Sequence, residues 1–174
     1  MKTLLEYLKE AEAKHQAIGH FNFTTLDMFW GIFDAARKTS DEQGEKIPII
    51  AGVSEGERDF FGTQQAADFI HSVSQEYDYP LFINADHTYS VERAHEALDA
   101  GYDMVIIDGA EKPYDENVAM TKEVVTYRDA IDSHAIIEAE LGYIGGGSNI
   151  KDELPEGVSE ETMTKPAEAA QFVA

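Results

Sequence analysis

The sequence predicts an α/β protein built on a parallel β-sheet, and two patterns lead to this fold class. Short apolar runs alternate with amphipathic stretches along the whole chain, giving five strand–helix alternations with short connections and no hairpin turn signals. The predicted strands are also apolar nearly throughout, as expected for a sheet that is covered on both faces. A doubly wound sheet and a (β/α) barrel both satisfy these patterns, so the residues alone leave both open.

The N-terminal part of the chain supplies two predicted helices and two predicted strands. Residues 3–15 carry leucines at helical spacing and acids every few residues, which predicts an amphipathic helix and not a signal peptide. The run AIGHFNF at residues 17–23 predicts the first strand. Residues 25–40 have a broad apolar face typical of a helix, and the β-branched run IPIIAGVS at residues 47–54 predicts the second strand.

The middle of the chain continues the same alternation. Residues 63–76 have the pattern of a helix, and LFINAD at residues 81–86 predicts the third strand. A helix follows over residues 90–100, because Ser90 is suited to its N-cap and Gly101 comes directly after its end.

The last part of the chain adds two strands. DMVIID at residues 103–108 and AIIEAEL at residues 135–141 predict strands, with a helix over residues 115–131 between them. The loop at residues 142–161 is long for a compact α/β protein, which indicates a functional or a disordered segment. Its three consecutive glycines fit either the hinge of a mobile lid or a plain surface loop. Pro166 opens the last predicted helix.

Composition limits the classes of function. A chain of 174 residues, 43% of them apolar, can bury the core of one domain, and no linker-like stretch divides residues 1–174. The absence of cysteine excludes disulfides and thiolate metal sites, and no apolar run is long enough to cross a membrane. We therefore expect a single-domain, soluble, cytoplasmic protein.

The charge excludes two kinds of partner. The 34 acidic residues outnumber the 13 lysines and arginines, and the net charge of −21 repels nucleic acids and anionic membranes. A phosphorylated substrate would need a local positive group, such as a metal ion or a helix N-terminus. An acid-rich surface suited to a salt-adapted organism is the alternative explanation of this charge.

Polar residues close every predicted strand at its C-terminal end. The carboxyl ends of neighbouring parallel strands open on one crevice, where active sites of α/β folds are built. We therefore expect these side chains to share one site. They are Asn22, Ser54, Asp86, Asp108 and Glu140.

The third strand adds an imidazole to this set. Neighbouring side chains of a strand point to opposite faces, so Asp86 and His87 can share a site only if the backbone bends. We therefore expect the third strand to end at Asp86, which leaves His87 on the following turn. Carboxylates and one imidazole around a common point suit a divalent metal with an acid/base carboxylate beside it. The other five histidines are expected in packed or solvated positions.

Four segments resemble, in the same order, the class II, metal-dependent fructose-bisphosphate aldolases and their tagatose-bisphosphate relatives. They are AIGHFNF, IIAGVSEGE, the stretch from FINADHTYS to DENVAMTK, and IIEAELGYIGG. The Asp-His pair, the IDG strand end, the P-x-x-E-N helix start and E-x-E-L-G-x-I-G-G form a specific combination. Together the segments cover most of the chain.

The resemblance implies a (β/α)8 TIM barrel of which the chain holds the first five β/α units, as a partial barrel. It also implies a zinc-dependent aldehyde-lyase, in which the metal polarises the ketose carbonyl. The implied reaction is the reversible cleavage of a ketose bisphosphate, with fructose 1,6-bisphosphate as the expected substrate, to dihydroxyacetone phosphate and an aldehyde. Because the family is commonly dimeric, we expect a homo-oligomer.

The resemblance also assigns roles to the strand ends. Asp86 corresponds to the acid/base that exchanges a proton with the hydroxyl at the cleaved carbon, and His87 corresponds to a zinc ligand. Asp108 and Glu140 correspond to carboxylates of an alternative metal position. The implied contacts to substrate are Asn22 and Ser54.

Parts of the family's site belong to later strands that these 174 residues do not include. They are two further zinc-binding histidines, the phosphate-binding strand ends and a site for a monovalent cation. We therefore expect the chain alone to lack aldolase activity, and the alternative function is a non-catalytic half-barrel that acts as a binding or assembly module. Five strands would also leave an open inner face without a partner. Its apolar residues are Ile18, Phe82, Met104, Ile106 and Ile136.

Overall fold

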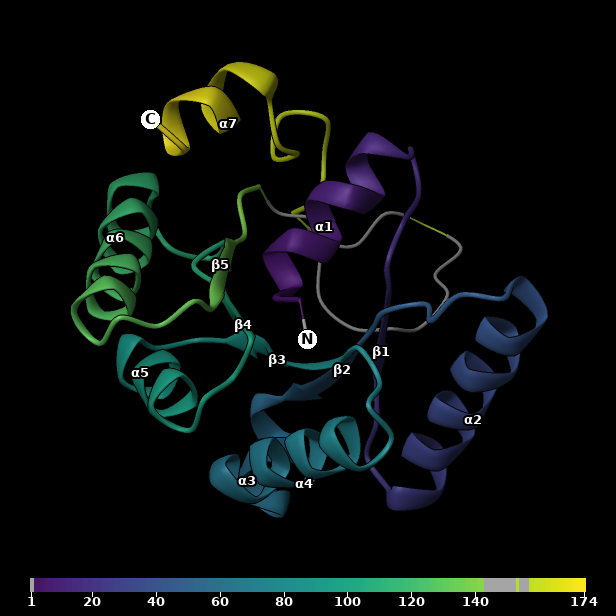
Figure 1. Cartoon of the computed structure of the whole chain (residues 1–174). Helices are drawn as coiled ribbons and strands as arrows, with labels where there is room; N and C mark the ends of the chain where they lie inside the picture. The colour runs from purple at the N-terminus through teal and green to yellow at the C-terminus, as the bar shows by residue number, and fades with distance from the viewer. Residues whose placement is uncertain (1, 143–152, 154–156) are drawn as a thin grey trace.

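The computed structural model describes residues 2–142, 153 and 157–174, and its centre is one parallel sheet. The five strands follow one another in the order β1-β2-β3-β4-β5, and every neighbouring pair is parallel. Figure 1 shows the sheet as an arc, with α2 to α6 outside it and α1 on its inner side. The strands are β1 (Gly19–Asn22), β2 (Ile49–Ser54), β3 (Leu81–Thr88), β4 (Met104–Ile107) and β5 (Ile136–Ala139).

Helices connect the strands in the manner of crossover units. Each lies between consecutive parallel strands, except for α1 before the sheet and α7 after it. The helices are α1 (Leu4–Ala13), α2 (Leu26–Gln43), α3 (Glu55–Phe61), α4 (Thr63–Glu76), α5 (Val91–Asp99), α6 (Tyr114–Ala130) and α7 (Pro166–Phe172).

The strand order decides between the two predicted architectures. A doubly wound sheet reverses its order at a switch point, with helices on both faces. Here the order is sequential and the crossover helices share the outer face, as in a segment of a (β/α) barrel. The predicted parallel, sequential arc is therefore confirmed. In the described part of the chain, β1 and β5 each pair on one side only.

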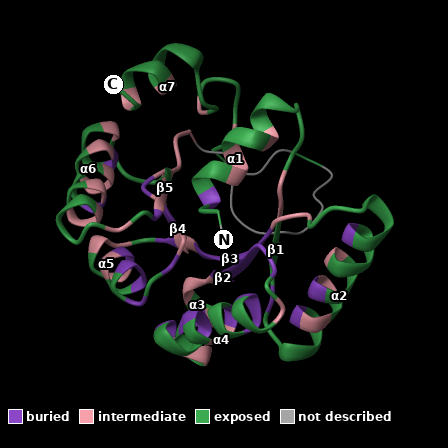
Figure 2. Cartoon of the chain, viewed as in Figure 1, coloured by how far each residue is buried: buried purple, intermediate pink, exposed green. Residues whose placement is uncertain are grey.

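The main core lies between the sheet and the outer helices, where Figure 2 shows the central strands β2, β3 and β4 mostly buried. Alternate residues of the strands point outward into it, such as Ile83 of β3 and Ile107 of β4, both fully buried. Aromatic side chains of α2 belong to the same core, with Phe29 and Phe33 stacked at 5.8 Å. This outer core stabilises the arc without using the inner face.

The expectation of an open inner face is wrong at the N-terminal ends of the strands, because α1 covers it. Leu4 packs with Ile50 and Phe82, and the ring of Tyr7 meets that of Phe82 edge to face at 5.7 Å. Partly buried inner residues pack against the same cluster; they are Ile18, Met104 and Ile136. The helix begins at a capping box formed by Thr3 and Glu6. The C-terminal half of the inner face carries the polar strand ends.

The helix α3 was not predicted. It is short, with Gly56 in its first turn and Gly62 directly after its end, yet Ser54 and Glu57 form a capping box at its start, which is a signal that sequence carries. The helix places Arg58, which is 1% exposed, behind the sheet. None of the helices in the described residues is long and apolar enough to span a bilayer.

An ion pair joins α4 to the loop before β4. Asp103 accepts a hydrogen bond from the backbone N–H of Ile83 (2.9 Å), and the same oxygen lies 3.4 Å from Nε2 of His71. The hydrogen bond to Asp103 raises the pKa of His71 above its ordinary value, against the smaller opposing effect of burial. A raised pKa means that the pair stabilises the fold fully below the unfolded pKa of about 6.5. This contribution is lost as the pH rises through the folded pKa.

We predict that His71→Gln lowers the free energy of unfolding at pH 5.5 and has almost no effect at pH 8.5. The loss at low pH should be about 0.2–1 kcal/mol, since the imidazole is 43% exposed and solvent screens the pair. Urea unfolding at both pH values measures it. The matched control is His134→Gln, at an exposed histidine. An equal loss at both pH values would show that protonation of His71 does not contribute.

Candidate active site

The C-terminal ends of β1, β3, β4 and β5 bring the predicted polar side chains together on the inner face. Parallel pairing sets Asn22 opposite Gly52, and Ser54 opposite Asp86. Asp108 and Glu140 come directly after β4 and β5. The sequential order of the strands therefore places all of these residues at one end of the sheet.

The third strand does not end at Asp86, as we expected, but continues through a β-bulge to Thr88. Ala85 pairs with Val105 and Thr88 pairs with Ile107, so two residues of β3 face one residue of β4. The second of these two residues, His87, has a φ of 39°, in the left-handed region. The extra residue breaks the alternation of the strand. Asp86 and His87 can therefore share one site without the strand stopping.

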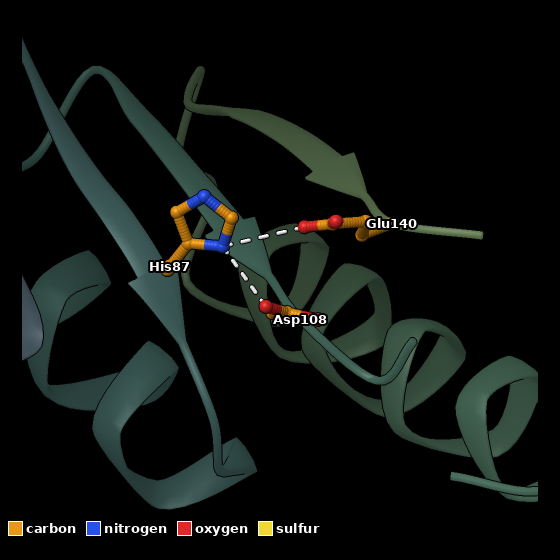
Figure 3. Close-up of side chains that lie close together, drawn as sticks. All are labelled: His87, Asp108 and Glu140. Atoms are coloured by element: carbon orange, nitrogen blue, oxygen red, sulfur yellow. Dashed lines mark hydrogen bonds and ion pairs between the residues drawn. The ribbon is translucent and has the colours of Figure 1, made fainter. Parts of the chain in front are cut away.

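The imidazole of His87 meets two carboxylates, as Figure 3 shows. Its Nδ1 lies 2.9 Å from Oδ2 of Asp108 and 3.3 Å from Oε2 of Glu140. One potential ligand atom from each residue lies within 4.8 Å of the others, and this is the only such group of three in the part of the chain that the structure describes. Of the residues that the sequence singled out, these three form a group that could hold a metal ion.

The charges of this group are mutually dependent. Burial raises the pKa of Glu140, and the neighbouring charge of Asp108 raises it further, while His87 opposes this shift. Burial lowers the pKa of His87, but the hydrogen bond to Asp108 and the charges of Asp86, Glu140 and Asp108 together raise it above its ordinary value. A positive charge at this position is therefore favourable, whether it comes from a proton or from a cation.

Asp86 lies beside His87, Asp108 and Glu140, which we call the metal group, and a residue of β1 forms a hydrogen bond with it. The amide Nδ2 of Asn22 donates to Oδ2 of Asp86 at 2.6 Å. Gly52 lies between their strands, and a Cβ there would clash with the side chains of Asn22 and His20. The absence of a side chain on β2 thus permits the contact between β1 and β3.

Ser54 is placed differently from the other predicted residues. Its hydroxyl accepts from the backbone N–H of Glu57, and its own N–H donates to the Glu57 carboxylate at 2.6 Å. Ser54 therefore caps α3 at the rim of the site. The three glycines that fit either a hinge or a plain surface loop, Gly145 to Gly147, lie outside the described residues.

Sequence reasoning missed Asn117, although it is part of the P-x-x-E-N helix start. It is 2% exposed, and its Nδ2 donates to the backbone carbonyl of Glu140 at 2.7 Å. Its Oδ1 lies against Gly109, where a Cβ would clash with it. The buried amide of Asn117 thus contacts the backbone at Gly109, next to Asp108, and the backbone of Glu140.

Comparison with known proteins finds one family over nearly the whole chain. The family described as "Fructose-bisphosphate aldolase class-II" matches residues 2–174. A 6-phospho-5-dehydro-2-deoxy-D-gluconate aldolase of Bacillus licheniformis is 38% identical over 149 residues, covering 83% of this chain and 48% of the relative. A fructose-bisphosphate aldolase of Staphylococcus aureus is 35% identical over 147 residues, covering 83% of this chain and 49% of the relative.

Solved structures show the same arrangement of strands and helices. The crystal structure of the YdjI aldolase from Escherichia coli K12 superposes with a TM-score of 0.76 at 27% identity, covering 99% of this chain and 60% of that one. A putative fructose-1,6-biphosphate aldolase from Coccidioides immitis gives a TM-score of 0.72 at 25% identity, covering 98% of this chain and 56% of that one.

The chain spans about half the length of the curated relatives it matches, while the family match runs over nearly all of its own residues. Its five parallel strands correspond to about half of the barrel in the class II aldolase structures. The chain therefore belongs to the class II fructose-bisphosphate aldolase family.

Proposed function

We propose that the chain is the part of a zinc-dependent aldehyde-lyase that carries its acid/base and part of its metal site. The reaction is the reversible aldol cleavage of a ketose bisphosphate, fructose 1,6-bisphosphate first, to dihydroxyacetone phosphate and an aldehyde. Membership of the family supports the reaction class. The observation that carries the proposal is the convergence of His87, Asp108 and Glu140 beside Asp86.

The donors of this group suit zinc. Imidazole nitrogen and carboxylate oxygen are both zinc ligands, and the nitrogen of His87 that faces the carboxylates is Nδ1. The neighbouring charge of Asp108 contributes to the raised pKa of Glu140, and a cation shared by the two carboxylates would offset this repulsion. In this proposal His87 binds zinc, with Asp108 and Glu140 as further ligands. When bound, zinc acts as a Lewis acid that polarises the ketose carbonyl.

Asp86 is proposed as the acid/base. It takes the proton from the hydroxyl at the cleaved carbon and returns it in the aldol direction. The hydrogen bond from Asn22 fixes one carboxylate oxygen, which leaves the other free to face the substrate. Asn22 and Ser54 are proposed to contact the substrate from β1 and from the rim at β2.

The relatives support a second candidate substrate. The protein of Bacillus licheniformis is named for 6-phospho-5-dehydro-2-deoxy-D-gluconate, which carries a carboxylate and one phosphate. The same acid/base and metal group would serve its cleavage. Cleavage assays decide between the two if both substrates are offered to a full-length barrel, in which the later strands complete these 174 residues. A non-catalytic half-barrel that serves binding or assembly remains the alternative if neither substrate is cleaved.

The unpaired edges of the sheet support the proposal that the chain associates with other copies of itself. In the described chain, β1 and β5 have unpaired outer edges, and unpaired strand edges promote pairing with another chain. Phe21 of β1 and Met28 of α2, the helix that follows it, are 45% and 46% exposed. We propose a dimer or a larger homo-oligomer that covers these surfaces.

We predict that Asp86→Ala in the full-length barrel lowers turnover about 10²–10⁴-fold and leaves the zinc content unchanged. Asp86 lies next to the metal group and is not one of its three members. An aldol-cleavage assay beside metal analysis measures both quantities. Asp86→Asn keeps the size of the side chain and should lose as much activity. A fully active Asp86→Ala enzyme would rule out the acid/base role.

We predict that His87→Ala in the full-length barrel, unlike Asp86→Ala, lowers the amount of bound zinc. The variant removes the only nitrogen ligand of the described metal group. Metal analysis after dialysis against a weak chelator measures the loss. The control is His134→Ala, which removes an exposed histidine at the other end of β5. Equal zinc contents in His87→Ala and the unmodified protein would contradict the proposed ligand.

The 174-residue chain by itself should associate and should not cleave fructose 1,6-bisphosphate. Unpaired edges favour association, and the family resemblance places two further zinc-binding histidines and the phosphate-binding strand ends on later strands that these 174 residues do not include. Light scattering and a zinc-supplemented cleavage assay test the two statements. A folded monomer that cleaves the substrate at ordinary enzyme rates would contradict both.

A further inference from the structure

A buried arginine lies directly behind the bulge that carries Asp86 and His87. Arg58, on α3, is 1% exposed, although arginine is rarely buried without partners. Its nearest carboxylate is Glu55, at 4.0 Å, and Glu55 also accepts from the backbone N–H of Tyr89 at 3.1 Å. The guanidinium therefore depends mainly on neutral acceptors, and all of these lie at the ends of β2 and β3.

The donors of Arg58 hold the chain on both sides of His87. Nη1 donates to the carbonyl of Val53 at 2.8 Å and to the carbonyl of Asp86 at 3.3 Å. Nη2 donates to Oγ1 of Thr88 at 2.9 Å, and Thr88 is fully buried. One rigid group thus bonds to the residue before His87 and to the residue after it.

A bulge in this position needs such support. The extra residue interrupts the regular ladder between β3 and β4, which leaves backbone groups without strand partners. His87 also adopts a left-handed conformation that non-glycine residues rarely adopt. Without partners for Asp86 and Thr88, a regular strand would be favoured. A regular strand would turn His87 to the outer face.

We propose that Arg58 is a positioning residue that fixes the bulge of β3 and so directs His87 toward Asp108 and Glu140. The side chain never enters the inner face and acts through the backbone of Asp86 and the hydroxyl of Thr88. Its consequence for zinc binding rests on the proposed function, whereas its consequence for the conformation of His87 does not. A fork of several N–H donors is required, so a lysine ammonium is not an equivalent.

The test measures the zinc affinity of the 174-residue chain by competition with a chromophoric chelator. Arg58→Met should weaken zinc binding about 10–100-fold, as is typical when a residue that orients a metal ligand is lost. Arg58→Lys should remain weakened, because one ammonium cannot reproduce the fork. The control is Arg93→Met, an arginine paired with Asp59 and Glu96 outside the bulge, and it should keep the unmodified affinity.

A second variant keeps the test decisive if Arg58→Met does not fold. Thr88→Val conserves shape and removes the acceptor of Nη2, so it should weaken zinc binding in the same direction but less. In the Arg58→Met background, Thr88→Val should add nothing, because the two side chains act through one contact. Unchanged zinc affinity in folded Arg58→Met, or in Thr88→Val, would overturn the proposal.

A destabilising variant far from the bulge tests whether Arg58→Met weakens zinc binding only because it lowers the stability of the fold. Phe33→Leu removes packing from the outer core on α2, away from the bulge. It should lower the free energy of unfolding and leave the zinc affinity of the folded chain unchanged. If Phe33→Leu and Arg58→Met weaken zinc binding equally at matched loss of stability, Arg58 has no positioning role.

The ring and amide resonances of His87 give a readout without metal. They should shift in Arg58→Met and stay in place in Arg93→Met. If they shift while the unmodified chain binds no zinc, the positioning role stands and the proposed metal function fails. If they do not shift, the positioning role fails whatever the zinc affinity.

Discussion

The bulge at Asp86 and His87 is the constraint on which the site depends. A regular strand would send one of these side chains into the outer core and the other to the inner face. Two residues facing one on β4 remove that choice, so an acid and an imidazole from adjacent positions reach the same end of the sheet. His87 then meets the carboxylates that follow β4 and β5. The site is thus assembled by one local departure from regular pairing within an otherwise regular arc.

The outer face of the sheet carries most of the hydrophobic core, and the inner face carries the candidate active site. The outer face is packed with apolar and aromatic side chains against α2 to α6. On the inner face, α1 covers the N-terminal half, and the C-terminal half holds the polar strand ends. Two buried polar side chains, Arg58 and Asn117, connect the layers by holding the backbone at Asp86 and at Glu140. The net charge of −21 repels a phosphorylated substrate, so a bound cation would supply the local positive charge that attracts it.

Much of this was predictable from sequence, because polar residues close each strand and parallel strands share one open end. That reasoning places Asn22, Asp108 and Glu140 at one end of the sheet, where Asn22 donates to Asp86 and both carboxylates lie against His87. It assumed regular alternation, so it ended β3 at Asp86 and missed the bulge, which depends on Arg58 from another element. A charged residue is expected at the surface, and no local pattern marks Arg58 as buried. The cover provided by α1 was also missed, since an amphipathic pattern does not say which surface it meets.

The central claim is that His87, Asp108 and Glu140 form a zinc site at the open end of the sheet. Crystals of the full-length barrel grown with zinc, with diffraction measured on both sides of the zinc absorption edge, test it most directly. We expect an anomalous peak within bonding distance of Nδ1 of His87 and next to the carboxylates of Asp108 and Glu140. A fully occupied zinc ion elsewhere, with no peak at His87, would contradict it.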